Sequence, residues 1–243
     1  MSFHDYCEHI NWDDHKKLDE MQNFFSFFRP MNLHLQKGVE VWKKYQHLFP
    51  SKKFVFKIYH EKPHKEWPVI VLINKQAFIE KVAAHLNDFK TTLGPHISPQ
   101  GILKKAIESD SFFYDILKMH DGLLGTLLGY GRNNAWLFER KWRLLGSYAN
   151  FYFPLKPFYS KPSAGFTTVE EELCFLQNKL QGLDNFMPTP FTFIIPIGFM
   201  VDREDPETKI TRKKFKETQR KMTKIYREGN FLETTLKAFT DTL

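Results

Sequence analysis

Cysteine is nearly absent from this chain. Only Cys7 and Cys174 occur among its 243 residues, whereas small folds held together by disulfides contain many more. No Cys-x-x-Cys pair is present, and neither cysteine lies in a local signature typical of a catalytic thiol. We therefore expect two reduced thiols and a fold stabilised by apolar packing.

Long apolar runs are also missing. Residues 122–130 and 191–201 are the longest nearly apolar stretches, and both are far shorter than the roughly 20 residues of a membrane-spanning helix. The first fifteen residues are charged where a secretory signal would be apolar. We expect a soluble, cytoplasmic protein without a transmembrane segment. Secretion or delivery into a host stays open, because the sequence does not fix the native N-terminus.

Aromatic side chains, in contrast, are abundant. Hydrophobic residues make up 42% of the sequence and aromatic residues 16%, with 25 phenylalanines, which excludes an intrinsically disordered chain. The formal net charge is +7. Spread over the surface of a protein of this size, that charge permits an anionic partner without requiring one.

The N-terminal part differs in character from the rest. Residues 1–35 form a polar and aromatic segment in which residues 16–28 have apolar side chains at helical spacing. Residues 39–48 are typical of a short amphipathic helix that Pro50 ends. Neither a low-complexity linker nor an internal repeat divides the following sequence. We therefore expect a single domain over residues 36–243, ending in a basic helix.

Three segments predict a small antiparallel sheet. Residues 53–60 and 68–74 are rich in β-branched and aromatic side chains, and the short polar segment between them indicates a hairpin. Pro68 suits the first position of a strand or an edge strand. Residues 191–201 form the third predicted strand. The sequence leaves the pairing order of these strands open.

Helical periodicity covers most of the remaining chain. Gly94 is a stop signal, Ser98 and Pro99 are a start signal, and Thr168 with Glu171 matches a capping box. We expect helices over residues 75–93, 99–107, from 110 or 111 into a glycine-containing stretch, 134–145, 169–180 and 210–227. The predicted fold class is α+β, a mainly helical single domain with about three strands.

The glycine-containing stretch GLLGTLLGYGRN, residues 122–133, is the most unusual part of the sequence. It contains four of the twelve glycines of the chain, at positions 122, 125, 129 and 131. A glycine inside a helix costs about 1 kcal/mol relative to alanine, so a structural reason is expected. Either the backbone approaches a neighbour closely here, or one helix ends in a left-handed turn and another begins.

A turn between two helices would offer an anion-binding site. Backbone N–H groups at the start of the second helix and a guanidinium group beside them both favour negative charge. The sequence lacks the ending of a Walker loop, and no strand precedes the glycines as in a dinucleotide fingerprint. The alternative is that the glycines and Asn133 only cap and pack the helices. The predicted binding residues are Gly129, Tyr130, Gly131, Arg132, Asn133 and Asn134.

The basic C-terminal helix is a second candidate surface. It could follow the phosphates of a nucleic acid or lie on an anionic membrane, with residues 113–129 and 134–145 forming a pair similar to a helix-turn-helix. The alternative is the solvated face of a helix that docks through its apolar side. The cationic residues on this predicted surface are Arg212, Lys213, Lys216, Arg220 and Lys224.

Histidines provide few catalytic or metal-binding signals. All ten lie at or before residue 120, so any imidazole must come from the first half of the chain. His120 and Asp121 point about 100° apart on a helix and cannot form a dyad with each other. His4, Cys7, His9 and His15 have suitable ligand atoms but match no zinc-finger spacing. We expect no metal and no cofactor.

Two segments resemble uncharacterised proteins of intracellular bacteria. These are LLGYGRNNAWLF at residues 127–138 and the closing pattern of a strand, an Asp-x-x-Asp-Pro break and a basic helix. The resemblance implies no activity, cofactor or site, and it is compatible with a host-associated or secreted role.

The sequence favours a non-enzymatic binding or interaction protein, since no catalytic motif is present. Its partner would be a protein or an anionic ligand recognised at the turn of residues 129–134. Nucleic-acid binding through the basic helix is the first alternative. An enzyme acting on a phosphorylated or carboxylated small molecule is the second, and it would need a histidine such as His120 or a carboxylate near Arg132. The oligomeric state stays open.

Overall fold

The computed structural model describes residues 37–38, 40–48, 50–61, 69–148, 161–182, 200–229, 233–235 and 237. The chain divides into two compact units, one made of residues 1–52 and 237–243 and the other of residues 53–236. In the first unit, residues 40–45 are helical and continue into the 3-10 helix η1 (Gln46–Leu48). The helix predicted over residues 16–28 lies outside the described residues, and a domain boundary at residue 36 stays a prediction.

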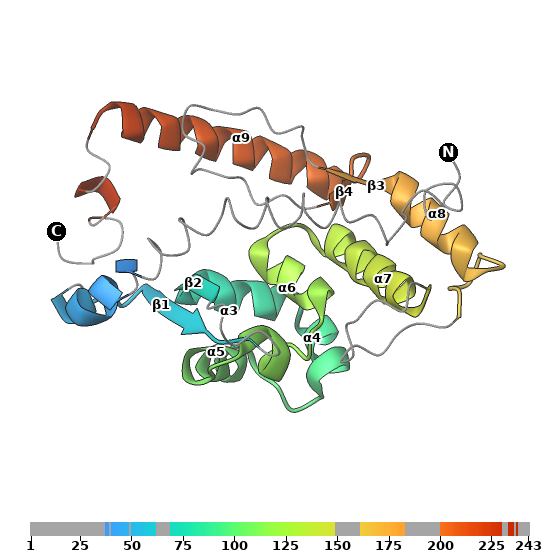
Figure 1. Ribbon diagram of the computed structural model, residues 1–243, viewed down its shortest axis with the longest axis horizontal. Helices are drawn as coiled ribbons and strands as arrows, with labels where there is room; N and C mark the ends of the chain where they lie inside the picture. Colours follow the sequence, from blue (N-terminus) through green and yellow to red (C-terminus); the bar gives the residue numbers. More distant parts are fainter. Residues whose placement is uncertain are drawn as a thin grey trace, which may run out of the picture. The chain divides into compact units, whose positions relative to one another are not determined.

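The larger unit is a mainly helical α+β fold (Figure 1). This is the predicted class, but the strands described form two separate antiparallel pairs rather than one sheet. The strands are β1 (Phe54–Tyr59), β2 (Val69–Asn74), β3 (Leu180–Gly182) and β4 (Met200–Asp202). The helices are α3 (Lys75–Ala84), α4 (Leu86–Leu93), α5 (Pro99–Glu108), η2 (Phe112–Ile116), α6 (Asp121–Leu128), α7 (Arg132–Tyr148), α8 (Val169–Lys179) and α9 (Pro206–Arg227).

The hairpin of β1 and β2 is confirmed, with Phe54 opposite Asn74 and Tyr59 opposite Val69. Because side chains alternate between the two faces of a strand, Tyr59 and Ile73 lie on one face, and both are buried. The hydroxyl of Tyr59 donates a hydrogen bond to the carbonyl of Ala106 in α5 at 2.7 Å. This face of the hairpin is thereby fixed to the helical part of the unit.

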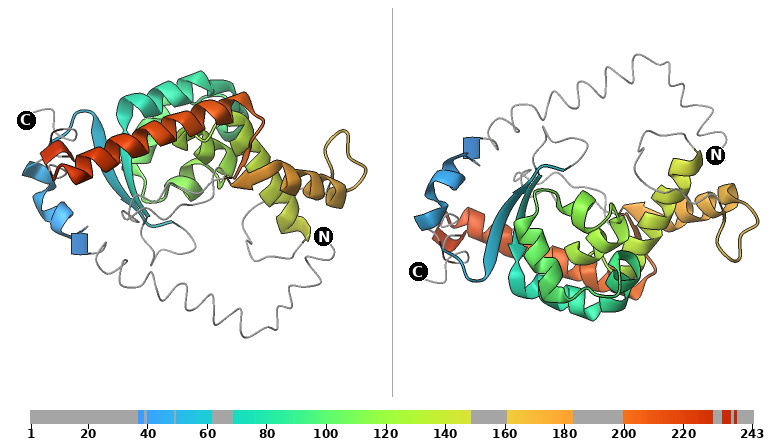
Figure 2. Two further views of the ribbon diagram at one scale, coloured as in Figure 1. Left: turned by 90° about the horizontal axis from the view of Figure 1, so that it is seen from above. Right: turned by 90° about the horizontal axis from the view of Figure 1, so that it is seen from below.

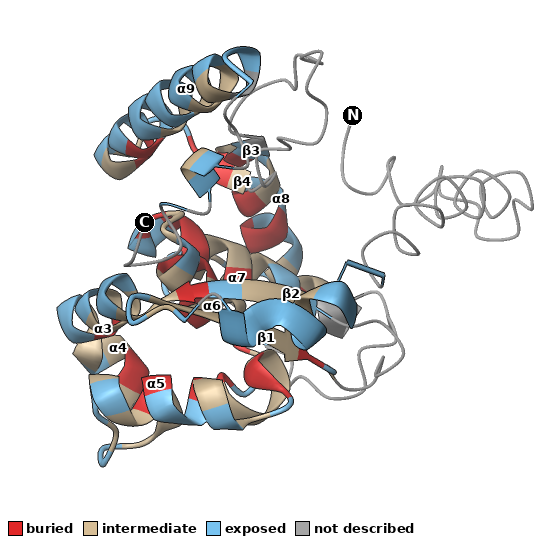
Figure 3. Ribbon diagram, turned by 90° about the vertical axis from the view of Figure 1, so that its left-hand side faces the viewer, coloured by how far each residue is buried: buried red, intermediate tan, exposed pale blue. Residues whose placement is uncertain are grey.

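The main hydrophobic core lies among the hairpin and the helices from α3 to α6 (Figure 3). Val82, Phe89, Leu117 and Leu123 are fully buried in it. A second, smaller cluster joins α7 and α8 through Leu144, Leu173 and Leu176.

Two predicted helices are interrupted. The helix expected over residues 75–93 breaks at His85, whose backbone is not helical, so that α3 and α4 are separate. The helix expected from residue 110 into the glycine stretch is also wrong. The chain forms the π-helical segment η2 and then leaves the helical conformation, with positive φ at Lys118 and Met119, before α6 starts at Asp121.

A carboxylate fixes the start of η2. Glu61, just after β1, accepts the backbone N–H groups of Phe112 and Phe113 at 2.8 and 2.9 Å, and that of Tyr114 at 3.2 Å. The hydroxyl of Ser111 donates to the same side chain at 2.6 Å. One side chain thus satisfies several N–H groups that a short helix leaves without internal partners.

The C-terminal elements differ from the prediction at their ends. Thr168 caps α8 as expected, with its hydroxyl accepting the N–H of Glu171 at 3.2 Å, but the helix ends at Lys179 and Leu180 already belongs to β3. Of the strand predicted over residues 191–201, only Met200 and Val201 lie in the described part, and both belong to β4. None of the described helices is both long and apolar enough to cross a lipid bilayer.

The basic helix begins four residues earlier than predicted. Asp205 accepts the N–H of Glu207 at 2.7 Å, and Pro206 occupies the first helical position, where its missing N–H costs nothing. The resulting helix, α9, is continuous over 22 residues (Figure 2).

Candidate functional site

The turn between α6 and α7 contains the predicted binding residues 129–134. Gly129 ends α6 in the left-handed conformation, with a φ of 81°, which glycine adopts without steric cost. Gly131 has a φ of 91°, and α7 starts immediately after it at Arg132. The structure therefore shows two helices, α6 and α7, joined by the short glycine turn on which the predicted anion site depends.

The glycine at position 125 allows α6 and α7 to approach closely. A methyl group placed at Gly125 would lie 2.8 Å from the Cβ of Ala135, closer than real side-chain carbons come to one another. Close packing of the two helices therefore explains the glycine at position 125. This is one of the two explanations that the sequence left open for the glycine stretch.

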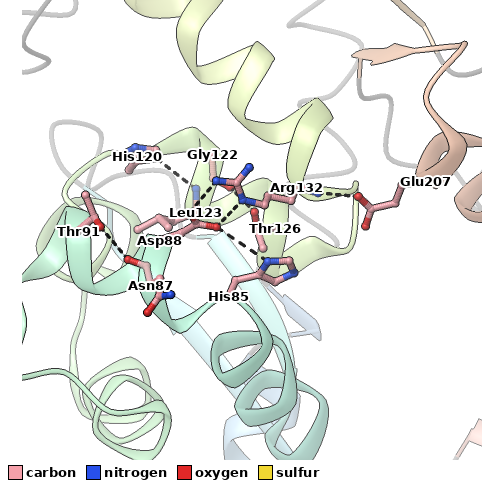
Figure 4. A network of polar contacts seen from close by, with 10 residues as sticks. All are labelled: His85, Asn87, Asp88, Thr91, His120, Gly122, Leu123, Thr126, Arg132 and Glu207. Carbon is pink, nitrogen blue, oxygen red and sulfur yellow. Dashed lines mark hydrogen bonds and ion pairs between the residues drawn. The ribbon is translucent and has the colours of Figure 1, made fainter.

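The donors of the turn bind carboxylates of the same chain. The backbone N–H of Arg132 donates to Glu207 Oε2 at 3.1 Å, and the side-chain amide of Asn133 donates to Asp205 Oδ2 at 2.6 Å. The guanidinium of Arg132 donates from Nε and Nη2 to Asp88 at 2.6 and 2.8 Å (Figure 4). These donors are thus engaged by three carboxylates of the chain itself, from α4 and the start of α9, and binding of an external anion at the turn stays a prediction.

The pair of Arg132 and Asp88 affects both pKa values. The hydrogen bond from Arg132 holds the pKa of Asp88 below its ordinary value, although partial burial of the carboxylate acts in the opposite direction. The same hydrogen bond raises the pKa of Arg132. Both groups are therefore charged at neutral pH.

Asn134 has a structural role within this turn. It is buried, its amide nitrogen donates to the Tyr130 carbonyl at 3.0 Å and to Thr208 Oγ1 at 2.8 Å, and its oxygen accepts the N–H of Asp202 at 2.9 Å. These bonds connect the start of α7 with β4 and α9. The side chain has no remaining capacity to donate to an added ligand.

A surface pocket of about 390 Å³ lies beside the turn, lined by residues 83–88 and Arg132. His85 and Asp88 contribute titratable groups to it, and His85 Nδ1 is 3.9 Å from Asp88 Oδ2. Neither residue was among the predicted site residues, because both lay within one predicted continuous helix. No glycine or proline marks the break at His85, so no local signal in the sequence indicates the pocket.

His120 does not line this pocket. It caps α6, its Nδ1 accepting the N–H of Leu123 at 3.2 Å, and it is buried against the ring of Trp136 with the ring centroids 4.8 Å apart. Glu139, also buried, accepts the N–H of Asp121 at 2.6 Å and a hydrogen bond from Arg143. The imidazole nearest Arg132 in the pocket is therefore that of His85.

The second predicted surface, on α9, is exposed. Figure 3 shows most of this helix as exposed, and its exposed cationic residues include all five that the sequence singled out: Arg212, Lys213, Lys216, Arg220 and Lys224. Only Thr208 and Thr211 of its described side chains are buried, and both belong to its first two turns.

The expected pair similar to a helix-turn-helix is not formed as predicted. Its first helix is interrupted between η2 and α6, and α7 packs against α6, α8 and β4. The histidines and the cysteine of residues 4–15 lie outside the described residues. Within the described residues, no group of three or more His, Cys, Asp or Glu side chains is placed to hold a metal ion.

Comparison of the chain with protein-family models, with curated proteins and with solved structures finds no match.

Proposed function

We propose that this protein is a non-enzymatic binding protein that contacts the phosphate backbone of nucleic acid through α9. The distribution of charge carries this proposal. The helix contains nine Lys or Arg residues and two Glu, a formal charge equal to the +7 of the whole chain. The other residues of the chain are therefore balanced in charge, and the positive charge is concentrated on one exposed helix.

The dimensions of α9 suit a duplex. A helix of 22 residues is about 33 Å long, close to one helical turn of B-form DNA. Cationic side chains occur along most of this length, from Lys209 to Arg227. Such a row can neutralise several successive phosphates and release their counterions, which is the main source of sequence-independent affinity.

An anionic membrane is a weaker fit to the same helix. Binding in a bilayer interface requires an apolar face that can insert among the lipids. On α9 the apolar side chains Phe215, Met222 and Ile225 are already partly buried, and Ile210 is the one large hydrophobic side chain described as exposed there. Cationic contacts to phosphates need no such face.

The salt dependence of affinity tests this function. Fluorescence anisotropy with a duplex of roughly 30 base pairs should give a log–log slope of affinity against salt of about −0.9 for each phosphate contacted. Replacing Arg212, Lys213, Lys216, Arg220 and Lys224 with Gln should reduce the magnitude of that slope by up to about 4.5, if each contacts one phosphate. A matched control replaces five exposed lysines elsewhere, namely Lys37, Lys43, Lys104, Lys105 and Lys161.

Two results would contradict the proposal. A flat salt dependence of the unmodified protein would remove nucleic-acid binding altogether, because phosphate contacts release counterions. If the salt slope falls equally in the α9 variant and in the control, the affinity depends on the total charge of the protein and not on a binding surface on α9.

A further inference from the structure

Arg132 is held in a fixed orientation at the edge of the pocket. Its Nε and Nη2 donate to the two oxygens of Asp88, so one edge of the guanidinium is engaged (Figure 4). Its central carbon lies 5.5 Å from the centroid of the Trp136 ring, a stacking distance for a cation on an aromatic face. An arginine restrained in this way loses little conformational entropy when it binds a ligand.

The other edge of the same guanidinium is available. An arginine has five N–H donors, and the two to Asp88 leave both hydrogens of Nη1 and one of Nη2. No acceptor for these three lies among the residues that the structure describes, and the side chain is 51% exposed. Two of them form an end-on fork that fits the two oxygens of a carboxylate.

The remaining lining of the pocket adds polar and apolar groups. His85, Asn87 and Asp88 line the pocket from the start of α4, and Figure 4 shows the imidazole of His85 beside the carboxylate of Asp88. Ala83, Ala84 and Leu86 supply the apolar part. A small ligand with an anionic end and an apolar body suits this combination.

The charge of the pocket limits the ligand. Asp88 already compensates the single positive charge of Arg132. A phosphate dianion would add two negative charges beside Asp88, and the residues lining the pocket include no second permanent cation. A carboxylate adds only one, and the positively charged guanidinium edge of Arg132 faces it.

We propose that this pocket is a binding site for a small monocarboxylate, held end-on by Arg132 and flanked by His85. The site is separate from the exposed face of α9 and goes beyond the nucleic-acid contact proposed above. It also differs from a helix N-terminal site, because the backbone N–H of Arg132 is occupied by Glu207.

Nuclear magnetic resonance on the full-length, ¹⁵N-labelled protein tests this site, with benzoate and propionate as probes at constant ionic strength. The Nε–H signal of Arg132 and the indole N–H signal of Trp136 should shift with saturation, at dissociation constants of about 1 mM or below. The variant Arg132→Lys keeps the charge but loses the fork, so affinity should fall roughly tenfold. Arg203→Lys, an exposed arginine in the turn before α9, is the matched control and should leave affinity unchanged.

A second variant separates binding from mere stability. Asp88→Asn removes the negative charge beside the site while its amide oxygen still accepts from Arg132, so carboxylate affinity should rise several-fold. A purely structural Arg132–Asp88 pair would give no gain in affinity.

Three outcomes would overturn the carboxylate site. The first is that neither signal shifts at about 50 mM probe, in the unmodified protein or in Asp88→Asn. The others are that chloride shifts the signals as much as the probes do, or that Arg132→Lys binds the probes with unchanged affinity. The five-residue Gln variant of α9 should bind both probes as the unmodified protein does. Failure of the carboxylate site and failure of the nucleic-acid proposal are thereby distinguished.

Discussion

The side-chain oxygen of Asn134, in the first turn of α7, accepts the backbone N–H of Asp202 at the end of β4 across 68 residues of sequence. The same side chain donates to Thr208 of α9 and to the carbonyl of Tyr130. One buried amide therefore joins three segments of the chain, and its hydrogen-bonding groups are all satisfied.

Replacing Asn134 with Ala should destabilise the protein strongly. The change removes three hydrogen bonds and leaves the N–H of Asp202 buried without an acceptor, so the free energy of unfolding should fall by about 2–4 kcal/mol. Urea denaturation measures this loss. The neighbouring Asn133→Ala removes one exposed hydrogen bond to Asp205 and should cost less than about 1 kcal/mol. Similar losses in both variants would contradict a special role for Asn134.

Replacing Gly125 with Ala should push α6 and α7 apart. Because the new methyl group would meet the Cβ of Ala135, we expect a loss of about 1–3 kcal/mol, measured by thermal or urea unfolding. Adding Ala135→Gly to this variant removes the obstructing carbon and should restore part of the stability. If the double variant is as unstable as the sum of both single variants, the close contact is not the cause.

Acid should weaken the attachment of α8. Hydrogen bonds to Glu172 from Arg140 and from the hydroxyl and N–H of Ser163 lower its pKa from 4.5 to about 2. A pKa lowered by folding contributes stability that is complete above pH 4.5 and is lost as pH falls toward 2.

The variant Glu172→Gln isolates this effect. The difference in unfolding free energy between the unmodified protein and this variant should be largest above pH 4.5 and shrink toward pH 2. Urea titrations at several pH values give this difference directly. A difference that stays constant over the range would show that the charge of Glu172 adds nothing to stability.

Loss of the Glu61 side chain should expose the start of η2. Glu61→Ala leaves the N–H groups of Phe112 and Phe113 without their acceptor, and we expect a loss of about 2–3 kcal/mol. Hydrogen exchange of these two amides should accelerate more than that of the core helices. Glu108→Ala is a control at an exposed carboxylate paired with Lys104, where the effect should be within about 0.5 kcal/mol.

Local signals in the sequence were sufficient for much of the fold. The hairpin, the Ser98 cap of α5 and the Thr168 cap of α8 all depend on residues close together in the chain, and all three are confirmed. The left-handed turn at Gly129 is likewise a local property of glycine.

Two features of the fold were missed. No glycine or proline marks the break at His85, and the π-helical segment that starts at Phe112 is held by Glu61, about fifty residues earlier. Arg132 was predicted to bind an anionic group from its local sequence alone, and no local signal indicates that Asp88, 44 residues away, binds one edge of its guanidinium. Long-range pairing of this kind leaves no periodicity to read.

The concentration of charge on α9 also has a consequence for how the protein can diverge. Beyond Thr211 the lysine and arginine side chains of this helix are exposed, so substitutions at those positions open no cavity and leave the interior intact. Its exposed lysines and arginines can be exchanged for other residues with little loss of folding stability, whereas changes at Asn134 or Gly125 disturb buried contacts. The affinity of α9 for a partner can therefore be altered by substitution while the packing of the rest of the unit is kept.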